Sequence, residues 1–264
     1  MLQLTVLASG SSGNSLLVRG ESTAVLVDAG ISARQLETQI LALGITPQNL
    51  AGILLTHEHG DHTRGLKVFC SKHRVPVFTN PLTADSLRKS AIDTEWRLFN
   101  SGSAFEIGEL RIHPFSVPHD AADPVGFIVS TANSSLGILT DLGYATRQII
   151  HAVRGVHALI IETNHDETLL QNDTKRPWSV KQRILSRHGH LSNQAAAKLV
   201  AEIATENLRP ILLAHLSEDC NTPEIACDTI RQNLPPTLPA PEIHCPGTPP
   251  HPIPHTIRIG HSVV

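Results

Sequence analysis

The chain has 264 residues, of which 41% are hydrophobic and 17% are charged, and its formal net charge is −3. This composition is typical of a soluble globular protein and excludes a polycation, so any contact with nucleic acid must come from a local basic patch. Four cysteines are too few for a disulfide framework in a chain of this length. No basic residue precedes the apolar run at the N-terminus, and no apolar run approaches about 18 residues. We therefore expect a cytoplasmic protein without a membrane partner.

The predicted elements mix strands and helices along the whole chain. In the first half of the chain we expect strands at 2–7, 15–18 and 23–27, a helix at 34–43 between Ser32 and Gly44, strands at 53–55 and 76–78, and a helix near 82–91. Four strands follow at 103–107, 110–116, 125–130 and 135–140. In the remainder we expect a helix at 146–153, a strand at 156–162, a helix at 193–204 capped by Ser192, a strand at 210–215, a helix at 222–231 and a strand near 256–259. This order predicts an α/β fold with two packed sheets and helices on both outer faces. We expect a single domain over 1–264, with a Pro-rich, irregular tail at 234–255.

A histidine-rich loop follows the short strand at 53–55. Thr56-His57-Glu58-His59-Gly60-Asp61-His62 places three imidazoles and a carboxylate within six residues. Nitrogen and carboxylate ligands suit Zn²⁺, Mn²⁺ or Fe²⁺. The alternative is a solvated polar loop, but this spacing of ligand types is rare by accident, so the loop predicts a metal site.

Further ligands must come from other strand ends, since one loop cannot complete two metal sites. His119, Asp141 and His215 each lie just after a predicted strand, in VPHDAADPVGF, ILTDLGY and LLAHLSEDC. For either histidine taken alone, a hydrogen-bonded core residue is the alternative.

The motifs HEHGDH, PHD, TDLG and AHLS, in this order, resemble the ligand motifs of the metallo-β-lactamase superfamily. ASGSSGNS near the N-terminus, ETNHD at 162–166 and HGHLSNQAAA at 188–197 are similar to its YycJ-like (or WalJ-like) branch, described as metal-dependent exonucleases. The resemblance covers residues 1 to about 221 and does not extend to the Pro-rich tail after 234. It implies a four-layer αββα sandwich of two mixed β-sheets.

The resemblance also implies a pair of divalent metal ions. One would be bound by His57, His59 and His119, the second by Asp61, His62 and His215, with Asp141 bridging the two. A carboxylate at the bridging position favours a hydroxide-bridged pair, whereas the β-lactamases themselves usually have a cysteine in this site, so antibiotic cleavage is disfavoured. Asp28 matches an aspartate that supports the histidine loop.

Two other residues are assigned by resemblance to the tRNA 3′-processing nucleases of the same superfamily. The GHLSNQAA segment places His190 where a histidine protonates the leaving oxygen, and Glu162 where an acid orients that histidine. The alternative for His190 is a helix-entry residue that packs near Ser192. His188 and His165 are weaker candidates for contact with substrate phosphate.

A basic run lies directly before this segment. Five cations without an acid occur between 175 and 190, namely Lys175, Arg176, Lys181, Arg183 and Arg187, and Trp178 adds an aromatic face for stacking. The run is interpreted either as a phosphate-binding patch that leads to the site or as an ordinary solvated helix.

The function that these motifs favour is two-metal phosphodiester hydrolysis, with a metal-bridging hydroxide as nucleophile and Asp61 orienting it. DNA degraded from an end is the favoured substrate. The rival is a small-molecule metallohydrolase, either a cyclic phosphodiesterase or a thioesterase similar to glyoxalase II, and the basic run argues against a thioester. A metal-binding regulator without catalysis is a third class, which no feature of the sequence favours.

Overall fold

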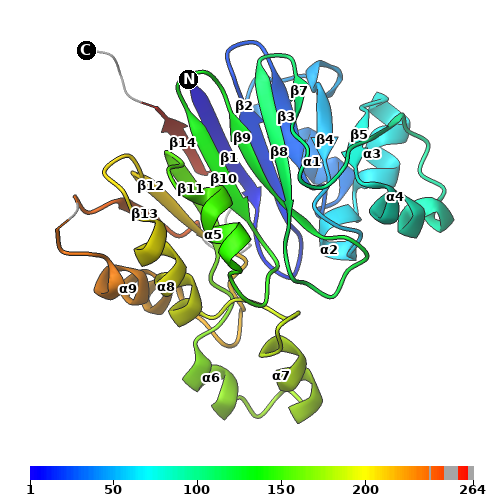
Figure 1. The fold of residues 1–264 in the computed structure, drawn as a ribbon. Coiled ribbons are helices and arrows are strands. Elements are labelled where there is room, and N and C mark those ends of the chain that lie inside the picture. The colour runs from blue at the N-terminus through cyan, green and yellow to red at the C-terminus, as the bar shows by residue number, and fades with distance from the viewer. Residues whose placement is uncertain (238, 247–254, 261–264) are drawn as a thin grey trace.

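The computed structural model describes residues 1–237, 239–246 and 255–260, and these residues form two facing β-sheets (Figure 1). The first sheet has the order β14 (His255–Ile259), β1 (Leu2–Ala8), β2 (Ser15–Arg19), β3 (Ala24–Val27), β4 (Gly52–Leu54), β5 (Val77–Thr79) and β6 (Trp96–Leu98). The second has the order β13 (Glu242–His244), β12 (Pro210–Ala214), β11 (Ala158–Glu162), β10 (Ser135–Leu139), β9 (Val125–Ser130), β8 (Leu110–Ser116) and β7 (Phe105–Ile107). Each sheet is mixed, because β3 to β6 and β10 to β13 pair in parallel while the remaining neighbours pair antiparallel.

Helices cover both outer faces of this pair of sheets. On the first sheet lie α1 (Ala33–Ala42), α3 (Leu66–His73) and α4 (Pro81–Leu87), and on the second lie α5 (Arg147–Val153), α8 (Asn193–Ile203) and α9 (Pro223–Asn233). The shorter helices are η1 (Pro47–Asn49), α2 (Gly60–Thr63), η2 (Arg88–Ser90), α6 (Glu167–Asn172) and α7 (Trp178–Ile184). Ser32 and Ser192 begin α1 and α8 by accepting a hydrogen bond from a backbone N–H of the first turn, as expected.

Alternation along the strands assigns each apolar side chain to one of two layers. In β2, Leu16 and Val18 lie between the sheets, whereas Leu17 lies under α1 and α3. In β12, Leu212 lies between the sheets and its neighbour Leu213 packs under α8 and α9. Successive strand residues point to opposite faces, so strands buried on both faces are apolar throughout. The predicted four-layer αββα sandwich is confirmed.

The structure differs from the predicted elements in several places. Within the tail at 234–255, Glu242–His244 forms β13, which pairs in parallel with β12, so the prediction that this tail is irregular was wrong there; residues 238 and 247–254 lie outside the described residues. Three backbone pairs at a sheet edge suffice for this strand, and they leave little periodicity in the sequence. Helices α3, α6 and α7 and strand β6 were not predicted. Of the helices that the structure describes, none has the length and apolar character needed to cross a membrane.

Candidate metal centre

Parallel neighbouring strands end at one edge of the sandwich, and the candidate ligands follow them directly. Asp28 follows β3, His57 comes shortly after β4, Asp141 follows β10 within two residues, and His215 follows β12. Asp28, Asp141 and His215 have left-handed backbone, with φ of 61°, 54° and 56°. Such a conformation costs a non-glycine residue roughly 1–3 kcal/mol and persists only where the surroundings enforce it. The chain therefore accepts backbone strain at three of these strand ends.

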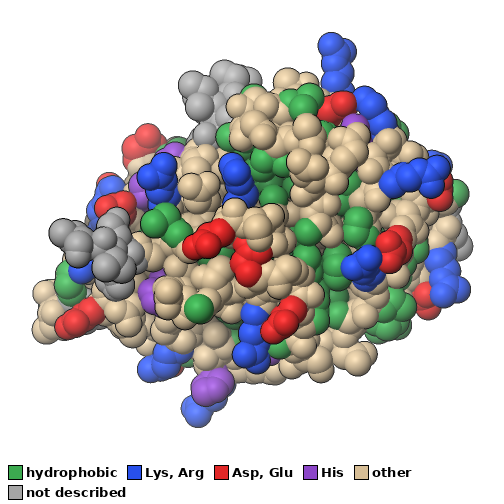
Figure 2. Space-filling view, turned by 90° about the horizontal axis from the view of Figure 1, so that it is seen from above, with side chains coloured by type: hydrophobic (Ala, Val, Ile, Leu, Met, Phe, Trp, Pro, Cys, Tyr) green, Lys and Arg blue, Asp and Glu red, His purple; other side chains and the backbone are tan. Residues whose placement is uncertain are grey.

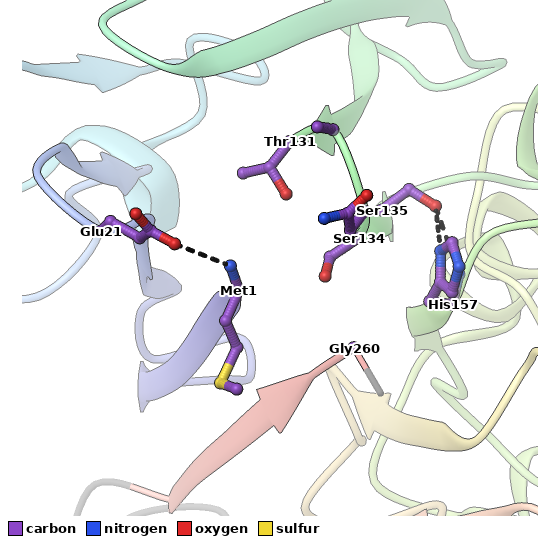
Figure 3. A pocket seen from close by; sticks show the side chains of 9 residues that line it. Met1, Glu21, Thr131, Ser134, Ser135, His157 and Gly260 are labelled. Carbon is purple, nitrogen blue, oxygen red and sulfur yellow. Dashed lines mark hydrogen bonds and ion pairs between the residues drawn. The ribbon is translucent and has the colours of Figure 1, made fainter. Parts of the chain in front are cut away.

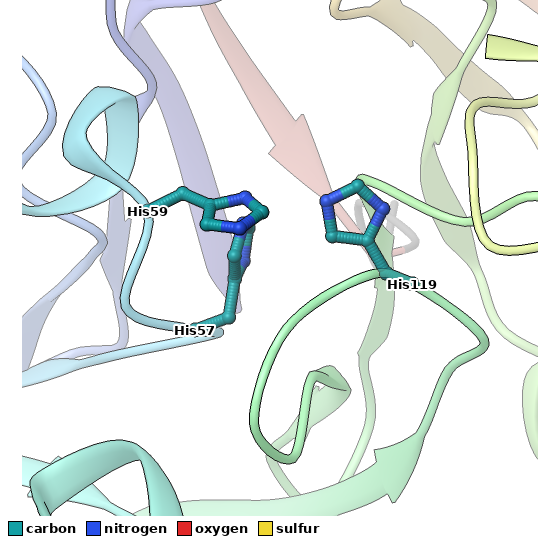
Figure 4. Close-up of side chains that lie close together, drawn as sticks. All are labelled: His57, His59 and His119. Carbon is teal, nitrogen blue, oxygen red and sulfur yellow. The ribbon is translucent and has the colours of Figure 1, made fainter. Parts of the chain in front are cut away.

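The first predicted ligand set is brought together. His57 and His59 come from the loop after β4, and His119 faces them from the loop after β8 (Figure 4). One ring nitrogen of each lies within 4.8 Å of the others. His57 and His119 are buried and His59 is half-buried.

Hydrogen bonds from Asp28 and Thr56 fix two of the imidazoles. His62 Nδ1 donates to Asp28 Oδ2 over 2.7 Å. The Thr56 hydroxyl donates to the same carboxylate over 2.9 Å, and it accepts from His57 Nδ1 over 3.0 Å. Because Nδ1 of both rings is used in this way, Nε2 is the atom of each ring that can offer a lone pair to a cation. The support predicted for Asp28 is present, and Thr56 extends it to His57.

Two further imidazoles are held in the same tautomer. His119 Nδ1 donates to the carbonyl oxygen of Gly189 over 3.1 Å, and His215 Nδ1 donates to Glu162 Oε1 over 2.8 Å. Nε2 is again the atom of each ring that can bind a cation. Four rings from three loops thus turn the same nitrogen toward the centre of the cluster.

Several polar atoms at the centre of this cluster lack partners, which tests whether the residues fit a cation. His57 Nε2, His215 Nε2 and Asp141 Oδ2 are buried without a hydrogen bond. His62 Nε2 and Asp141 Oδ2 lie 3.0 Å apart, so a positive charge, either a proton on the ring or a metal ion, must lie between them. Leaving a buried polar atom unsatisfied costs about 1–3 kcal/mol, so the cluster is unfavourable unless a positive charge lies among these atoms. The donor set fits divalent metal ions.

The pKa values reflect the same concentration of charge. Burial and the positive charge of His62 lower the pKa of His57 well below its usual value, so that ring is neutral. Burial also lowers the pKa of His62, but the carboxylates of Asp28 and Asp141 outweigh it and raise that pKa to about 10. Burial opposes ionisation of Asp141, yet His215 and His62 hold its pKa well below the usual range. The cluster thus contains an anion that attracts cations.

The second predicted ligand set gathers around Asp61. Its Oδ2 lies 3.5 Å from His62 Nε2 and 3.7 Å from His215 Nε2. The side-chain amide of Asn14 donates to the same oxygen over 3.2 Å and to His62 Nε2 over 3.1 Å. Asn14 belongs to the ASGSSGNS segment near the N-terminus, and its contact with Asp61 was not predicted from the sequence.

Glu162 holds two histidines rather than one. Its Oε1 accepts from His190 Nδ1 over 2.7 Å as well as from His215 Nδ1, and its Oε2 accepts the backbone N–H groups of Leu142 and Leu191. Burial raises the pKa of Glu162, but the charge of His190 outweighs it and the pKa falls to about 2. The predicted contact between His190 and Glu162 is therefore present, and the same carboxylate also orients a candidate ligand.

The predicted substrate-binding residues are not gathered into one patch. Arg176 pairs with Asp173 and Asp219, and Arg183 with Asp120. Lys181 is buried, and its Nζ donates to the carbonyl oxygen of Gln171, so the phosphate-binding role predicted for Lys181 does not fit the structure. His165 is 1% exposed and does not reach the surface of the site either. His188 and Arg187 are exposed next to the site.

A cavity of about 880 Å³ opens at the other end of the sandwich, where β1 begins (Figure 3). Its titratable groups are paired, because the N-terminal amine lies 3.7 Å from Glu21 and His157 bonds with Ser135 over 2.8 Å. Figure 2 shows this end, with basic and acidic side chains interspersed over the part that the structure describes. The described residues that line this cavity offer no unpartnered imidazole or carboxylate atom, so the histidine cluster remains the candidate site.

Comparison with known proteins agrees with this geometry. The family profile described as "Beta-lactamase superfamily domain" matches residues 23–212. The chain is 37% identical to exodeoxyribonuclease YycJ of Bacillus anthracis, over 88% of this chain and 89% of the relative. It is 33% identical to exodeoxyribonuclease WalJ of Streptococcus pneumoniae, over 87% of each chain. The crystal structure of the metallo-β-lactamase fold protein YhfI from Bacillus subtilis matches with a TM-score of 0.75 at 14% identity, covering 98% of this chain and 100% of that one. The chain is thus a metal-dependent hydrolase that belongs to the β-lactamase superfamily, in the YycJ-like and WalJ-like branch.

Proposed function

We propose that this chain is a two-metal phosphodiesterase that degrades DNA from an end. The observation that carries the proposal is the cluster of unpartnered Nε2 and carboxylate atoms, which faces His190 across Asp141. The relatives named exodeoxyribonuclease, at 37% and 33% identity, favour DNA as the substrate.

The ligand assignment follows the predicted sets. His57, His59 and His119 would hold one cation, Asp61, His62 and His215 a second, with Asp141 between them. Zn²⁺, Mn²⁺ and Fe²⁺ all suit this donor set. Bound there, the cations would supply a deprotonated water as nucleophile and positive charge for the phosphate oxygens.

The chain's own residues orient the reactants and move the proton. Asp61 Oδ2 lies between His62 and His215, where a carboxylate can orient an attacking water. His190 Nδ1 is held by Glu162, so Nε2 is the atom that can protonate the leaving oxygen. Burial lowers the pKa of His190, but Glu162 outweighs it and raises the pKa above the usual value, which favours the protonated ring that this role needs.

Metal analysis and a defined set of substrates test the proposal. Two equivalents of metal per chain are expected after reconstitution with Zn²⁺ or Mn²⁺. The loaded chain is then incubated with end-labelled single- and double-stranded DNA and RNA, and mononucleotides released from one DNA end are expected. Intact DNA together with rapid hydrolysis of a cyclic phosphodiester or a glutathione thioester would favour the small-molecule alternative. A metal content near zero would contradict the proposal altogether.

A further inference from the structure

Arg187 differs from the other cations of the basic run in having no acidic or carbonyl partner among the described residues. Lys175, Arg176 and Arg183 bind carboxylates, and Lys181 binds a backbone carbonyl. Among the described residues, no carboxylate lies within ion-pair distance of Arg187, and its side chain is exposed. We propose that Arg187 binds a phosphate of the nucleic-acid strand other than the one that is cut, an inference that rests on the proposed function.

The guanidinium of Arg187 is held by an aromatic ring beside the candidate ligands. Its Cζ lies over the ring of Tyr144, 4.6 Å from the centroid. Tyr144 is half-buried, is the only tyrosine in the chain and lies three residues after Asp141. A cation over an aromatic face is attracted by the ring quadrupole, so the side chain keeps one position at little cost in entropy.

Glycines fix the backbone of Arg187 against the loops that carry the ligands. A Cβ added to Gly143 would lie 2.4 Å from the carbonyl carbon and oxygen of Arg187, so a larger residue cannot fit without a backbone shift. The N–H of Gly143 donates to the carbonyl of Pro118 over 2.9 Å, and His119 Nδ1 donates to Gly189 O. The loops that carry His119, Asp141 and Arg187 therefore pack as one unit. A phosphate bound by Arg187 would be held at a fixed place relative to the metal ligands.

The free donors of Arg187 favour a phosphate as the ligand. Its Cζ lies over the ring of Tyr144, and none of its guanidinium N–H groups bonds to a described residue, so they are free to form two parallel hydrogen bonds. Phosphate oxygens match this arrangement, and Arg187 adds a charge that no carboxylate of the described chain neutralises. The two sources of such a phosphate are an internal phosphodiester of the strand and a terminal phosphate group.

A charge-deletion cycle tests the contact and locates the phosphate. A series of oligonucleotides is made in which each member carries one neutral methylphosphonate, placed one position further from the end than in the previous member. Each is made with and without a terminal phosphate. Their affinities for the metal-loaded wild-type and Arg187→Ala chains are measured by fluorescence anisotropy. Phosphorothioate end linkages limit hydrolysis during binding. Arg111→Ala is the matched control, because Arg111 is also exposed and unpaired but lies at the start of β8, away from the ligands.

Arg187→Ala is expected to weaken binding by about 10- to 100-fold, and Arg187→Lys by less, because lysine keeps the charge but not the paired donors. In Arg187→Ala, the slope of the logarithm of the binding constant against the logarithm of the salt concentration should be smaller in magnitude by about 0.7, which corresponds to one phosphate of a single strand. One methylphosphonate position, or removal of the terminal phosphate, should weaken wild-type binding and leave the Arg187→Ala affinity unchanged. Arg111→Ala should bind as wild type does.

If every methylphosphonate lowers the affinity of the wild-type and Arg187→Ala chains by the same factor, the inference is overturned. It is also overturned if Arg111→Ala weakens binding as much as Arg187→Ala does. Bis-p-nitrophenyl phosphate has only the scissile phosphate, so its hydrolysis should fall much less in Arg187→Ala than DNA degradation does. A chain that binds oligonucleotides through Arg187 but releases no nucleotide would contradict the proposed function while supporting the Arg187 contact. If the wild-type and Arg187→Ala chains degrade DNA equally well, the proposed function would be supported and the Arg187 contact contradicted.

Discussion

Two groups of charged side chains adjoin each other at one end of the sandwich, and they differ in whether their polar atoms have partners. At the metal centre, His57 Nε2, His215 Nε2 and Asp141 Oδ2 are buried and unpaired. In the basic run, Arg176 and Lys181 are bound to groups of the protein itself. The first arrangement is stable only with a ligand, whereas the second is complete without one. A cluster of titratable residues therefore indicates a binding site through its unsatisfied atoms rather than through its charge.

The largest effect is expected at Asp141, where the unpaired carboxylate oxygen faces His62. Asp141→Ala should lower DNA hydrolysis by several orders of magnitude and reduce the bound metal, because the negative charge that attracts both cations is lost. Asp141→Asn is the better-matched variant, since φ is 54° and asparagine tolerates left-handed backbone more readily than alanine. Metal analysis, turnover and thermal melting of the metal-free chains measure the effect. Wild-type turnover in either variant would show that the bridging assignment is wrong.

His190→Ala should have the next largest effect, and the effect should depend on the leaving group. A DNA alkoxide needs protonation and p-nitrophenolate does not, so DNA cleavage should fall by roughly 10²–10⁴-fold while bis-p-nitrophenyl phosphate is affected far less. Metal content should stay unchanged. His151→Ala is the control, because His151 is an exposed histidine on α5 that no described contact links to Glu162. Equal losses on both substrates, with loss of metal, would make His190 a ligand or a structural residue.

Glu162→Gln tests the link between the two groups of histidines. The loss of the carboxylate that orients His215 should weaken metal binding by about 10- to 100-fold. Because Glu162 raises the pKa of His190, the same variant should lower it, and the alkaline limb of the pH–rate profile should move to lower pH at saturating metal. An unchanged limb would indicate that His190 is not the titrating acid.

Sequence reasoning found residues that the structure brings together, because each candidate ligand follows a strand, where its place is set by the sheet rather than by side-chain contacts. His57, His119, Asp141 and His215 meet for this reason. Their supports were harder to predict. Glu162 was assigned to His190 alone, because its second partner, His215, arrives from another strand.

The fold was predicted where the apolar pattern was long, and missed where it was short. The four-layer arrangement follows from strands that are apolar throughout, such as β11 and β12. Strand β13 has only three residues in a Pro-rich segment, and tertiary pairing rather than local pattern forms it. Asn14 and Thr56 are short polar residues whose roles depend on which loop packs against them, and Lys181 is buried because its amine finds a carbonyl on α6.

The smallest effect is expected at Lys181, which belongs to the basic run but is satisfied inside the protein. Lys181→Met keeps most of the buried aliphatic chain and removes the hydrogen bond to Gln171 O. Loss of this bond should lower the free energy of unfolding by roughly 1 kcal/mol. For a chain of this size, that corresponds to a decrease in Tm of about 2–4 °C. The salt dependence of DNA binding should not change, because Nζ already has its acceptor and does not reach the substrate. A fall in DNA affinity as large as that of Arg187→Ala would contradict the comparison, since it would mean that Lys181 leaves Gln171 to bind phosphate.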